Sequence, residues 1–267
     1  MRVYIVTDME GVGGVVDDGQ VVPVGGQAYE EARRWLTLEV NAAVQGALAG
    51  GATQLVVLDG HGANKCRNIV YELLHEGATC IQGMPWPEYL PGLDSSFDAM
   101  FQIGVHAMAG TANAVLDHTM SSESWVEMRV NGQAMGEIGL CAAVAGHYGV
   151  PLVLVSGDDK ACREAANLVP GVESVVVKRG ISRNCAELIP MSNVLSAIRN
   201  RAEAALRKMS TGVIKPFRLE SPVELQIEYL QTSALQTIRE GEGVRKIGSR
   251  TVVYEGGDIV ELLARSL

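Results

Sequence analysis

Short apolar runs alternate with helical patterns along the first two thirds of the chain. Most of the runs are rich in Val, Ile and Leu, and they lie at 3–6, 54–58, 79–82, 99–105, 152–155 and 172–177. Apolar residues at helical spacing fill the intervals at 29–48, 69–74, 137–147 and 159–168. Strands that alternate with helices form mostly parallel sheets with helices on both faces. The sequence therefore predicts an α/β fold, with a mostly parallel sheet in a three-layer α/β/α arrangement.

The rest of the chain departs from this alternation. Residues 125–133 alternate apolar and polar side chains and end at the turn Asn131-Gly132, which predicts a β-hairpin inserted at about 120–133. A long amphipathic helix pattern leads from Ser192 to Gly212, and strand patterns at 223–229 and 251–254 precede a closing helix near 258–264. We expect residues 1–190 to form the α/β domain and residues 191–267 a smaller α+β domain.

Composition excludes several classes of protein. The 267 residues carry a net charge of -9, so nucleic acid, which is bound through clustered Lys and Arg, is not an expected partner. The sequence contains no apolar run of the roughly 20 residues that a membrane span needs, and Met1 leads directly into a strand pattern without a basic leader. We therefore expect a cytoplasmic protein that does not enter a membrane.

The cysteines do not indicate a disulfide framework or a cysteine-type zinc site. They are five in number, widely spaced and without a C-x-x-C pair: Cys66, Cys80, Cys141, Cys162 and Cys185. An odd number of scattered cysteines in an expected cytoplasmic protein is typical of free thiols. We expect them to be free and buried.

Acidic and imidazole side chains follow the ends of the predicted strands. Asp8 and Glu10 follow the first strand in TDMEG, Asp59 and His61 follow the second in LDGHG, and His106 follows the strand at 99–105. Ligands of open parallel sheets collect at the carboxyl ends of the strands, where the loops meet. We expect these side chains to approach one another at that edge.

The pair Asp8 and Glu10 predicts a bound cation. Side chains two residues apart in an extended segment point to the same side, and two ionised carboxylates in a partly buried site repel each other without a countercharge. Carboxylates together with imidazoles suit Zn²⁺ or Mn²⁺, and an Asp that bridges two ions would account for a second set of ligands. The alternatives are a solvated or helix-capping acid pair and, for His61, a turn residue.

The five histidines divide into two groups. His75 and His147 lie near the C-terminal ends of predicted helices, where a favourable interaction with the helix dipole is a sufficient structural role. The remaining three, His61, His106 and His118, lie on or after predicted strand ends. These three are the candidates for a functional site.

A series of motifs resembles one family of enzymes. TDMEGVGG, LDGHGANK, QIGVHAMAGT, DHTM, NGQAMGEIGL, SGDDKACREA and VKRGISR occur in this order. Together they resemble the M55 family of metallopeptidases, strongly over residues 1–190 and weakly beyond. The resemblance implies an aminopeptidase with two Zn²⁺ per subunit, or Mn²⁺ in their place. Its substrates would be short peptides or amino acid amides, from which it would release an N-terminal residue, D-Ala for example.

The resemblance also implies roles for individual residues. The metal ligands are Asp8, Glu10, His61, His106 and Glu137, with Asp8 bridging the two ions. Glu137 is identified by the resemblance alone, since a Glu in the first turn of a helix is usually explained by the helix dipole. The catalytic residue is His118 in His118-Thr119-Met120, preceded by Asp117, where the family has a small residue such as Ser. In Gly157-Asp158-Asp159, one Asp is expected to cap the helix at 159–168. The family further implies a homo-oligomeric ring, a decamer, that encloses a channel.

The predicted mechanism is metal-assisted hydrolysis of an amide, with His118 carrying a proton, because its ordinary pKa lies near neutrality. A nucleophilic role for His118 is the alternative. A second hypothesis is a dinuclear phosphoesterase, although the candidate ligands have no basic cluster beside them to bind phosphate. A third is a solute-binding α/β module without catalysis, although EGVGGVV lacks the third spaced glycine of a dinucleotide-binding loop.

Overall fold

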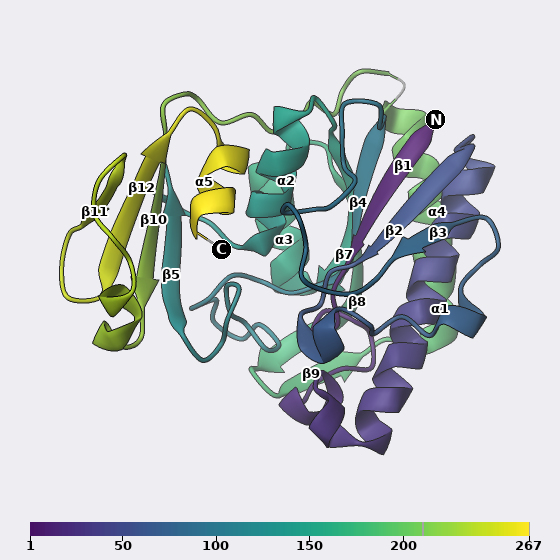
Figure 1. Cartoon of the computed structure of the whole chain (residues 1–267). Helices are drawn as coiled ribbons and strands as arrows, with labels where there is room; N and C mark the ends of the chain where they lie inside the picture. Colours follow the sequence, from purple (N-terminus) through teal and green to yellow (C-terminus); the bar gives the residue numbers. More distant parts are fainter. Residues whose placement is uncertain (210, 267) are drawn as a thin grey trace.

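A seven-stranded sheet forms the centre of the molecule in the computed structural model, which describes residues 1–209 and 211–266. The strand order is β3-β2-β1-β4-β7-β8-β9 (Figure 1). Neighbouring strands pair in parallel, except that β9 runs antiparallel to β8. The strands are β1 (Arg2–Thr7), β2 (Gln54–Asp59), β3 (Thr79–Ile81), β4 (Ala99–Val105), β7 (Leu152–Asp158), β8 (Glu173–Ser182) and β9 (Cys185–Leu188).

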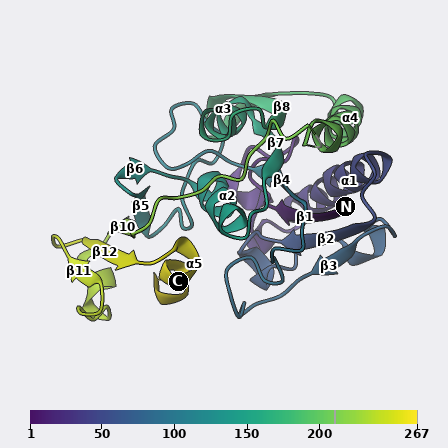
Figure 2. The ribbon, with the colours of Figure 1, turned by 90° about the horizontal axis from the view of Figure 1, so that it is seen from above.

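Helices cover both faces of this sheet. Helices α1 (Gln27–Ala49) and α4 (Met191–Met209) pack against each other on one face (Figure 2). Helices α2 (Glu137–His147) and α3 (Asp159–Leu168) cover the other face. The apolar stripe of α1 that the sequence predicted is buried, and β4 is buried along its whole length. A strand buried on both faces is what a continuous apolar run encodes.

A smaller antiparallel sheet stands beside the large one, in the order β11-β12-β10-β5-β6. The hairpin at 125–133 is confirmed as β5 and β6, joined through Asn131-Gly132, whose φ angles are positive at 49° and 77°. Helix α5 (Ile259–Ser266) packs against this sheet and α2. The strands are β5 (Trp125–Val130), β6 (Gln133–Ala134), β10 (Val223–Tyr229), β11 (Val244–Lys246) and β12 (Thr251–Gly256).

The predicted fold class, a mostly parallel three-layer α/β/α arrangement with a smaller α+β part, is confirmed. Strands from 125–134 and from 223–256 share the smaller sheet, and α4 packs on α1 and β8. The division into domains 1–190 and 191–267 stays a prediction. No helix in the described ranges is both long and apolar enough to cross a membrane.

The predicted helical stretch at 69–74 is wrong. Only a 3₁₀ turn at Tyr71–Leu73 forms there. The Asp59 carboxylate accepts the N–H groups of Asn68 and Ile69, and Thr37 Oγ1 accepts that of Val70, so side chains from other segments hold this backbone. At Leu74 the backbone is extended, with ψ at 136°, which ends the turn. Two short strands, β9 and β11, were not predicted. Further 3₁₀ turns lie at Asp18–Gln20, Pro23–Gly25, Ala63–Lys65 and Thr232–Gln236.

The strand order creates a switch point between β1 and β4. From β1 the chain crosses to β2 on one side, and β4 lies on the other, so the loops after β1 and β4 diverge from a common crevice. The loop after β1 lies against the end of β4: Gly11 N–H donates to Gly104 O at 2.8 Å, and Asp8 N–H donates to Ile103 O at 2.9 Å. A ligand is therefore expected between the ends of β1 and β4.

Candidate metal centre

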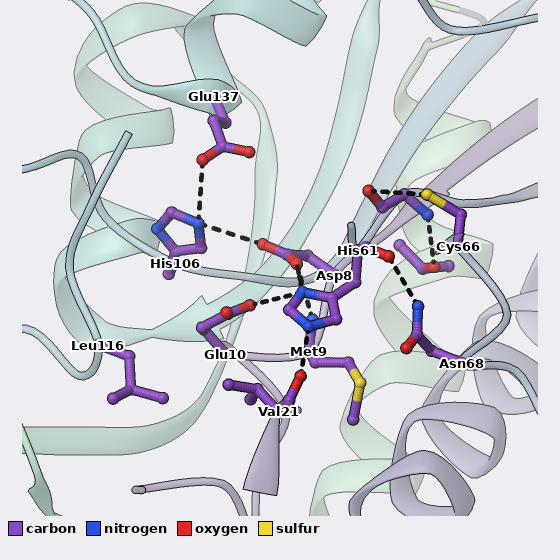
Figure 3. A network of polar contacts seen from close by, with 12 residues as sticks. Asp8, Met9, Glu10, Val21, His61, Cys66, Asn68, His106, Leu116 and Glu137 are labelled. Atoms are coloured by element: carbon purple, nitrogen blue, oxygen red, sulfur yellow. Dashed lines mark hydrogen bonds and ion pairs between the residues drawn. The ribbon is translucent and has the colours of Figure 1, made fainter. Parts of the chain in front are cut away.

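Five predicted ligands converge at this switch point. Asp8 and Glu10 lie in the loop after β1, His61 in the loop after β2, His106 directly after β4, and Glu137 in the first turn of α2 (Figure 3). They come from four separate segments of the chain. The structure thus brings together all five side chains that the sequence and the family resemblance indicated.

The two oxygens of Asp8 face two different groups of ligands. On one side, His61 Nδ1 lies 3.0 Å from Asp8 Oδ1 and 3.2 Å from Glu10 Oε2. On the other, His106 Nε2 lies 3.2 Å from Asp8 Oδ2 and 3.3 Å from Glu137 Oε1. Asp8 is the one side chain common to both groups, as a bridging carboxylate would be.

Backbone carbonyls orient the imidazole rings. His61 Nε2 lies 2.7 Å from Val21 O, and His106 Nδ1 lies 2.9 Å from Ala107 O. A carbonyl oxygen can only accept, so these nitrogens carry protons. The other nitrogen of each neutral ring, which faces the carboxylates, then presents a lone pair. This is how metal-binding histidines are usually oriented by a second group.

His118 lies beside the second group of ligands. Its ring stacks on that of His106, with 3.9 Å between the ring centroids and 13° between the planes. His118 Nδ1 is 2.8 Å from Leu116 O, so its Nε2 faces Glu137 Oε1 at 3.9 Å. Glu137 Oε1 also accepts the N–H of Met120 at 2.7 Å. The segment that carries His118 is thereby tied to Glu137.

The protein charges set the protonation of the centre. Burial, then the neighbouring Glu10, raises the pKa of Asp8 to about 7. Burial also acts to raise the pKa of Glu10, but the charges of His61 and His106 outweigh it and hold that pKa well below its usual range. Burial acts to lower the pKa of His61, but Glu10 and Asp8 outweigh it and raise that pKa well above the usual value. Within the polypeptide, imidazolium cations are therefore the groups that balance the carboxylates.

The second group behaves in the same way. Burial acts to lower the pKa of His106, but Glu137 outweighs it and raises that pKa well above the usual value. Burial acts to raise the pKa of Glu137, but the His106 charge outweighs it and lowers that pKa. His118 differs, because burial and the neighbouring His106 charge lower its pKa. Of the three histidines, His118 is the one whose surroundings favour the neutral ring.

The donor set fits a divalent cation. Among the described residues, Glu10 Oε2 is a buried oxygen with no hydrogen-bond partner, and it lies opposite His61 Nδ1. A buried carboxylate oxygen without a hydrogen bond is unfavourable unless a cation faces it, and a divalent cation could take the place of the imidazolium proton of His61. Ligand atoms of Asp8, Glu10 and His106 lie within 4.8 Å of one another, as do those of His106, His118 and Glu137. Oxygen and imidazole donors at such spacing suit Zn²⁺.

Other residues named from the sequence have structural roles. Asp59 is fully buried and binds Asn68, Ile69 and Gln82, so it supports the loop after β2 and does not face the centre. Asp158 is confirmed as the N-cap of α3, where it accepts the N–H groups of Lys160 and Ala161. All five cysteines are in the described chain and are free, but only three are buried, while Cys80 is half-buried and Cys185 is exposed.

Neither of the two remaining histidines lies in the centre. His147 is the last residue of α2, as expected. The expected place of His75 at a helix end is wrong, because no helix forms there; its Nδ1 accepts the N–H of Gly77 at 3.0 Å.

Two buried charged residues support the loop that carries Glu10, and the sequence reasoning missed both. The Lys178 ammonium donates to the carbonyls of Glu10, Val12 and Val15 at 2.6, 2.8 and 2.6 Å. Glu39 Oε1 accepts the N–H of Gly13 at 2.8 Å. Both side chains are fully buried. A signal existed: Lys178 directly follows the apolar run of β8, and Glu39 lies on the apolar stripe of α1.

Comparison with known proteins shows the family of this chain. The model of the M55 peptidase family, described as D-aminopeptidase, matches residues 1–266. The chain therefore belongs to the M55 family of peptidases, which confirms the resemblance and the expectation of a hydrolase that acts on peptide bonds.

Two relatives from Bacillus subtilis are similar over almost their whole length. A D-aminopeptidase of strain 168 is 32% identical over 263 residues, which cover 98% of this chain and 93% of the relative. A solved structure described as the Zn-dependent D-aminopeptidase DppA, a self-compartmentalizing protease, superposes with a TM-score of 0.92 at 31% identity. That match covers 100% of this chain and 95% of the DppA chain.

Proposed function

We propose that this chain is a zinc aminopeptidase that holds two Zn²⁺ per subunit and releases an N-terminal D-residue, D-Ala for example, from short peptides or amino acid amides. The observation that carries the proposal is the position of Asp8 between two carboxylate and imidazole groups. Asp8, Glu10 and His61 would hold one ion, and Asp8, His106 and Glu137 the other. The similarity to a Zn-dependent D-aminopeptidase supports zinc and the preference for D-residues.

The bound ions would polarise the scissile carbonyl and lower the pKa of a water molecule. The protein supplies the orientation and the proton transfer. His118 presents Nε2 to the centre because its Nδ1–H donates to Leu116 O. The stack on His106 keeps the ring in that position. A neutral His118 can accept a proton at Nε2 and then donate it to the departing amine.

A phosphoesterase is less well supported. The cleft beside the centre is lined by the acids Asp18 and Glu123, and among its described lining residues other than histidine, Arg183 is the one cation. Arg183 already pairs with Asp117 and Asp18. Away from the proposed ions, a phosphate ester would meet more negative than positive charge in the cleft. The same comparison argues against a module that binds anionic solutes.

The proposal is tested on the purified protein by elemental analysis and by hydrolysis of D- and L-Ala amides and p-nitrophenyl phosphate. We expect two zinc ions per subunit, cleavage of D-Ala amide, and loss of activity on dialysis against a chelator with recovery on adding Zn²⁺. Activity that survives removal of the metal, or cleavage of the phosphate ester alone, contradicts the proposal.

A matched pair of variants tests the role of His118. We expect His118→Ala to lower kcat about a hundredfold or more with unchanged zinc content. The control His75→Ala removes a histidine outside the centre and should keep normal kcat. Near-normal turnover of His118→Ala would exclude His118 as the proton carrier.

We also propose that the chain acts in the cytoplasm as a homo-oligomeric ring, a decamer. The description of DppA as self-compartmentalizing supports assembly. Light scattering or native mass spectrometry of the purified protein measures the number of subunits, and a monomer would contradict this part of the proposal.

A further inference from the structure

Two cavities meet at the metal centre. The first, which we call the open cleft, has a volume of about 620 Å³ and is lined by His61, His118, Glu123 and Arg183 among others. The second, which we call the apolar pocket, has a volume of about 240 Å³ and is lined by Cys66, Met84, Trp86, Tyr89, Leu90 and Cys141 among others. Asp8 and Glu137 line both cavities. A substrate held at the centre can therefore extend in two directions.

Apart from the proposed metal ligands Asp8 and Glu137, the lining of the apolar pocket carries no charged side chain. Burial raises the pKa of the Cys66 and Cys141 thiols to about 12, so both stay protonated near neutral pH. Burial also raises the pKa of Tyr89 well above its usual value, and the Tyr89 hydroxyl lies 3.6 Å from Cys141 Sγ. The remaining side chains named for this pocket are Met84, Trp86 and Leu90. Such a lining favours an apolar group and disfavours a charged one.

The position of His118 indicates which part of a bound peptide lies in which cavity. Among the described residues, His118 lines the open cleft and does not line the apolar pocket. Hydrolysis of an amide requires a proton for the departing amine, and the group that donates it must lie within hydrogen-bond reach. The departing part of the peptide therefore lies in the open cleft with His118. The N-terminal residue, on the other side of the scissile bond, lies towards the apolar pocket.

We infer that the apolar pocket binds the side chain of the substrate's N-terminal residue and favours apolar side chains larger than that of alanine, such as leucine or phenylalanine. This inference rests on the proposed aminopeptidase function. A volume of about 240 Å³ is several times the roughly 30 Å³ that one water molecule occupies in the liquid, so a methyl group leaves most of the pocket unfilled. Each additional buried methylene strengthens binding by about 0.8 kcal/mol.

The test compares amides that differ only in the N-terminal side chain. The zinc-loaded wild-type protein is assayed with the amides of D-Ala, D-Leu, D-Phe and D-Lys and with their L-counterparts. We expect kcat/KM for D-Leu amide to exceed that for D-Ala amide by about tenfold or more. D-Lys amide, which would bring a charge into the pocket, should be a poorer substrate than D-Leu amide.

Two pairs of variants locate the preference in the pocket. Cys141→Leu adds bulk to the wall of the pocket, and we expect it to lower the ratio of D-Leu to D-Ala activity about tenfold. Cys162→Leu is the control, because Cys162 is an equally buried cysteine on α3 outside the pocket. Trp86→Ala removes part of the apolar lining of the pocket. Because a large side chain then loses contacts, we expect this variant to lower the ratio of D-Phe to D-Ala activity. Trp125→Ala removes an indole elsewhere and should leave that ratio unchanged.

The outcomes separate this inference from the proposed function. Cleavage of D-Ala amide without a preference for D-Leu or D-Phe overturns the inference and leaves the aminopeptidase standing. Ratios that stay at the wild-type value in both Cys141→Leu and Trp86→Ala overturn it as well. Failure to cleave any of the amides overturns both. A size preference confined to L-amides supports the pocket and contradicts the expected preference for D-residues.

Discussion

Replacing Lys178 by Met should destabilise the protein strongly and weaken its hold on metal. Lys178 is fully buried, and its ammonium group donates to three backbone carbonyls in the loop that carries Glu10. Methionine has a similar length and leaves little empty space, but it donates no hydrogen bond. No substitution can remove the backbone carbonyls: those of Glu10 and Val15 lose this donor, and that of Val12 keeps only the N–H of Val15.

The structure sets the magnitude of the effect. Each buried carbonyl left without a partner costs about 1–3 kcal/mol. Removal of the buried, charged lysine recovers part of that cost, because the folded state no longer has to desolvate an ammonium group. A net loss of about 3–5 kcal/mol in the free energy of unfolding is expected, the range typical when one partner of a buried charged contact is removed. The free energy of unfolding of natural domains is about 5–15 kcal/mol, so the variant would be only marginally stable.

Urea unfolding, followed by circular dichroism, measures the loss, and elemental analysis measures bound zinc. Lys208→Met is the control, because Lys208 forms a 2.7 Å ion pair with Glu173 but its side chain is 36% exposed. An exposed pair of this kind contributes at most about 1 kcal/mol. A loss below about 1 kcal/mol in Lys178→Met, together with full zinc content, would refute the reasoning that this lysine holds the ligand loop in place.

Three further predictions concern residues around the same centre. Burial raises the pKa of Glu39 from 4.5 to about 7. The contribution of this residue to the free energy of unfolding is therefore fully present below pH 4.5 and is lost as the pH rises to about 7. The stability of Glu39→Gln relative to wild type should therefore improve by about 3 kcal/mol across that window, measured by urea unfolding at several pH values. In Gly104→Ala, the new Cβ would lie 2.3 Å from Asp8 O at a φ of +75°, so thermal unfolding should show a loss of about 3 kcal/mol or more and zinc content should fall. The control Gly110→Ala has a φ of +81° but no described heavy atom within 4 Å of the new Cβ, and should lose about 1 kcal/mol. Asp158→Ala removes the acceptor for the N–H groups of Lys160, Ala161 and Val115 and should lower the free energy of unfolding by about 2 kcal/mol; an unchanged urea midpoint would contradict its capping role.

Glu137 and Asp59 show the limits of predicting site residues from their positions at the ends of strands and helices. Both are acids next to a predicted element boundary. Asp59 follows a strand as Asp8 does, yet it is buried among the amides of its own loop. Glu137 begins a helix, where an acid is ordinary, yet it lies 3.3 Å from His106. Position along an element does not reveal which way a side chain turns, because that depends on the loop packed against it.

The sequence by itself determined most of the elements and the edge of the sheet at which polar side chains gather, but not β9, β11 or the absence of a helix at 69–74. Short apolar runs and helical spacing are local properties, so β1, β4 and α2 could be placed from nearby residues alone. Parallel strands bring their carboxyl ends to one edge, and this indicated that Asp8, His61 and His106 would approach one another.

Only the tertiary structure decided which groups touch. The hydrogen bonds of Lys178 reach back more than 160 residues to the loop after β1. The apolar pocket combines Cys66, Trp86 and Cys141 from three separate segments. Contacts between such distant residues depend on the order of the strands and on the paths of the loops. Neither is encoded in the periodicity of one segment, since each results from packing the whole chain around the sheet.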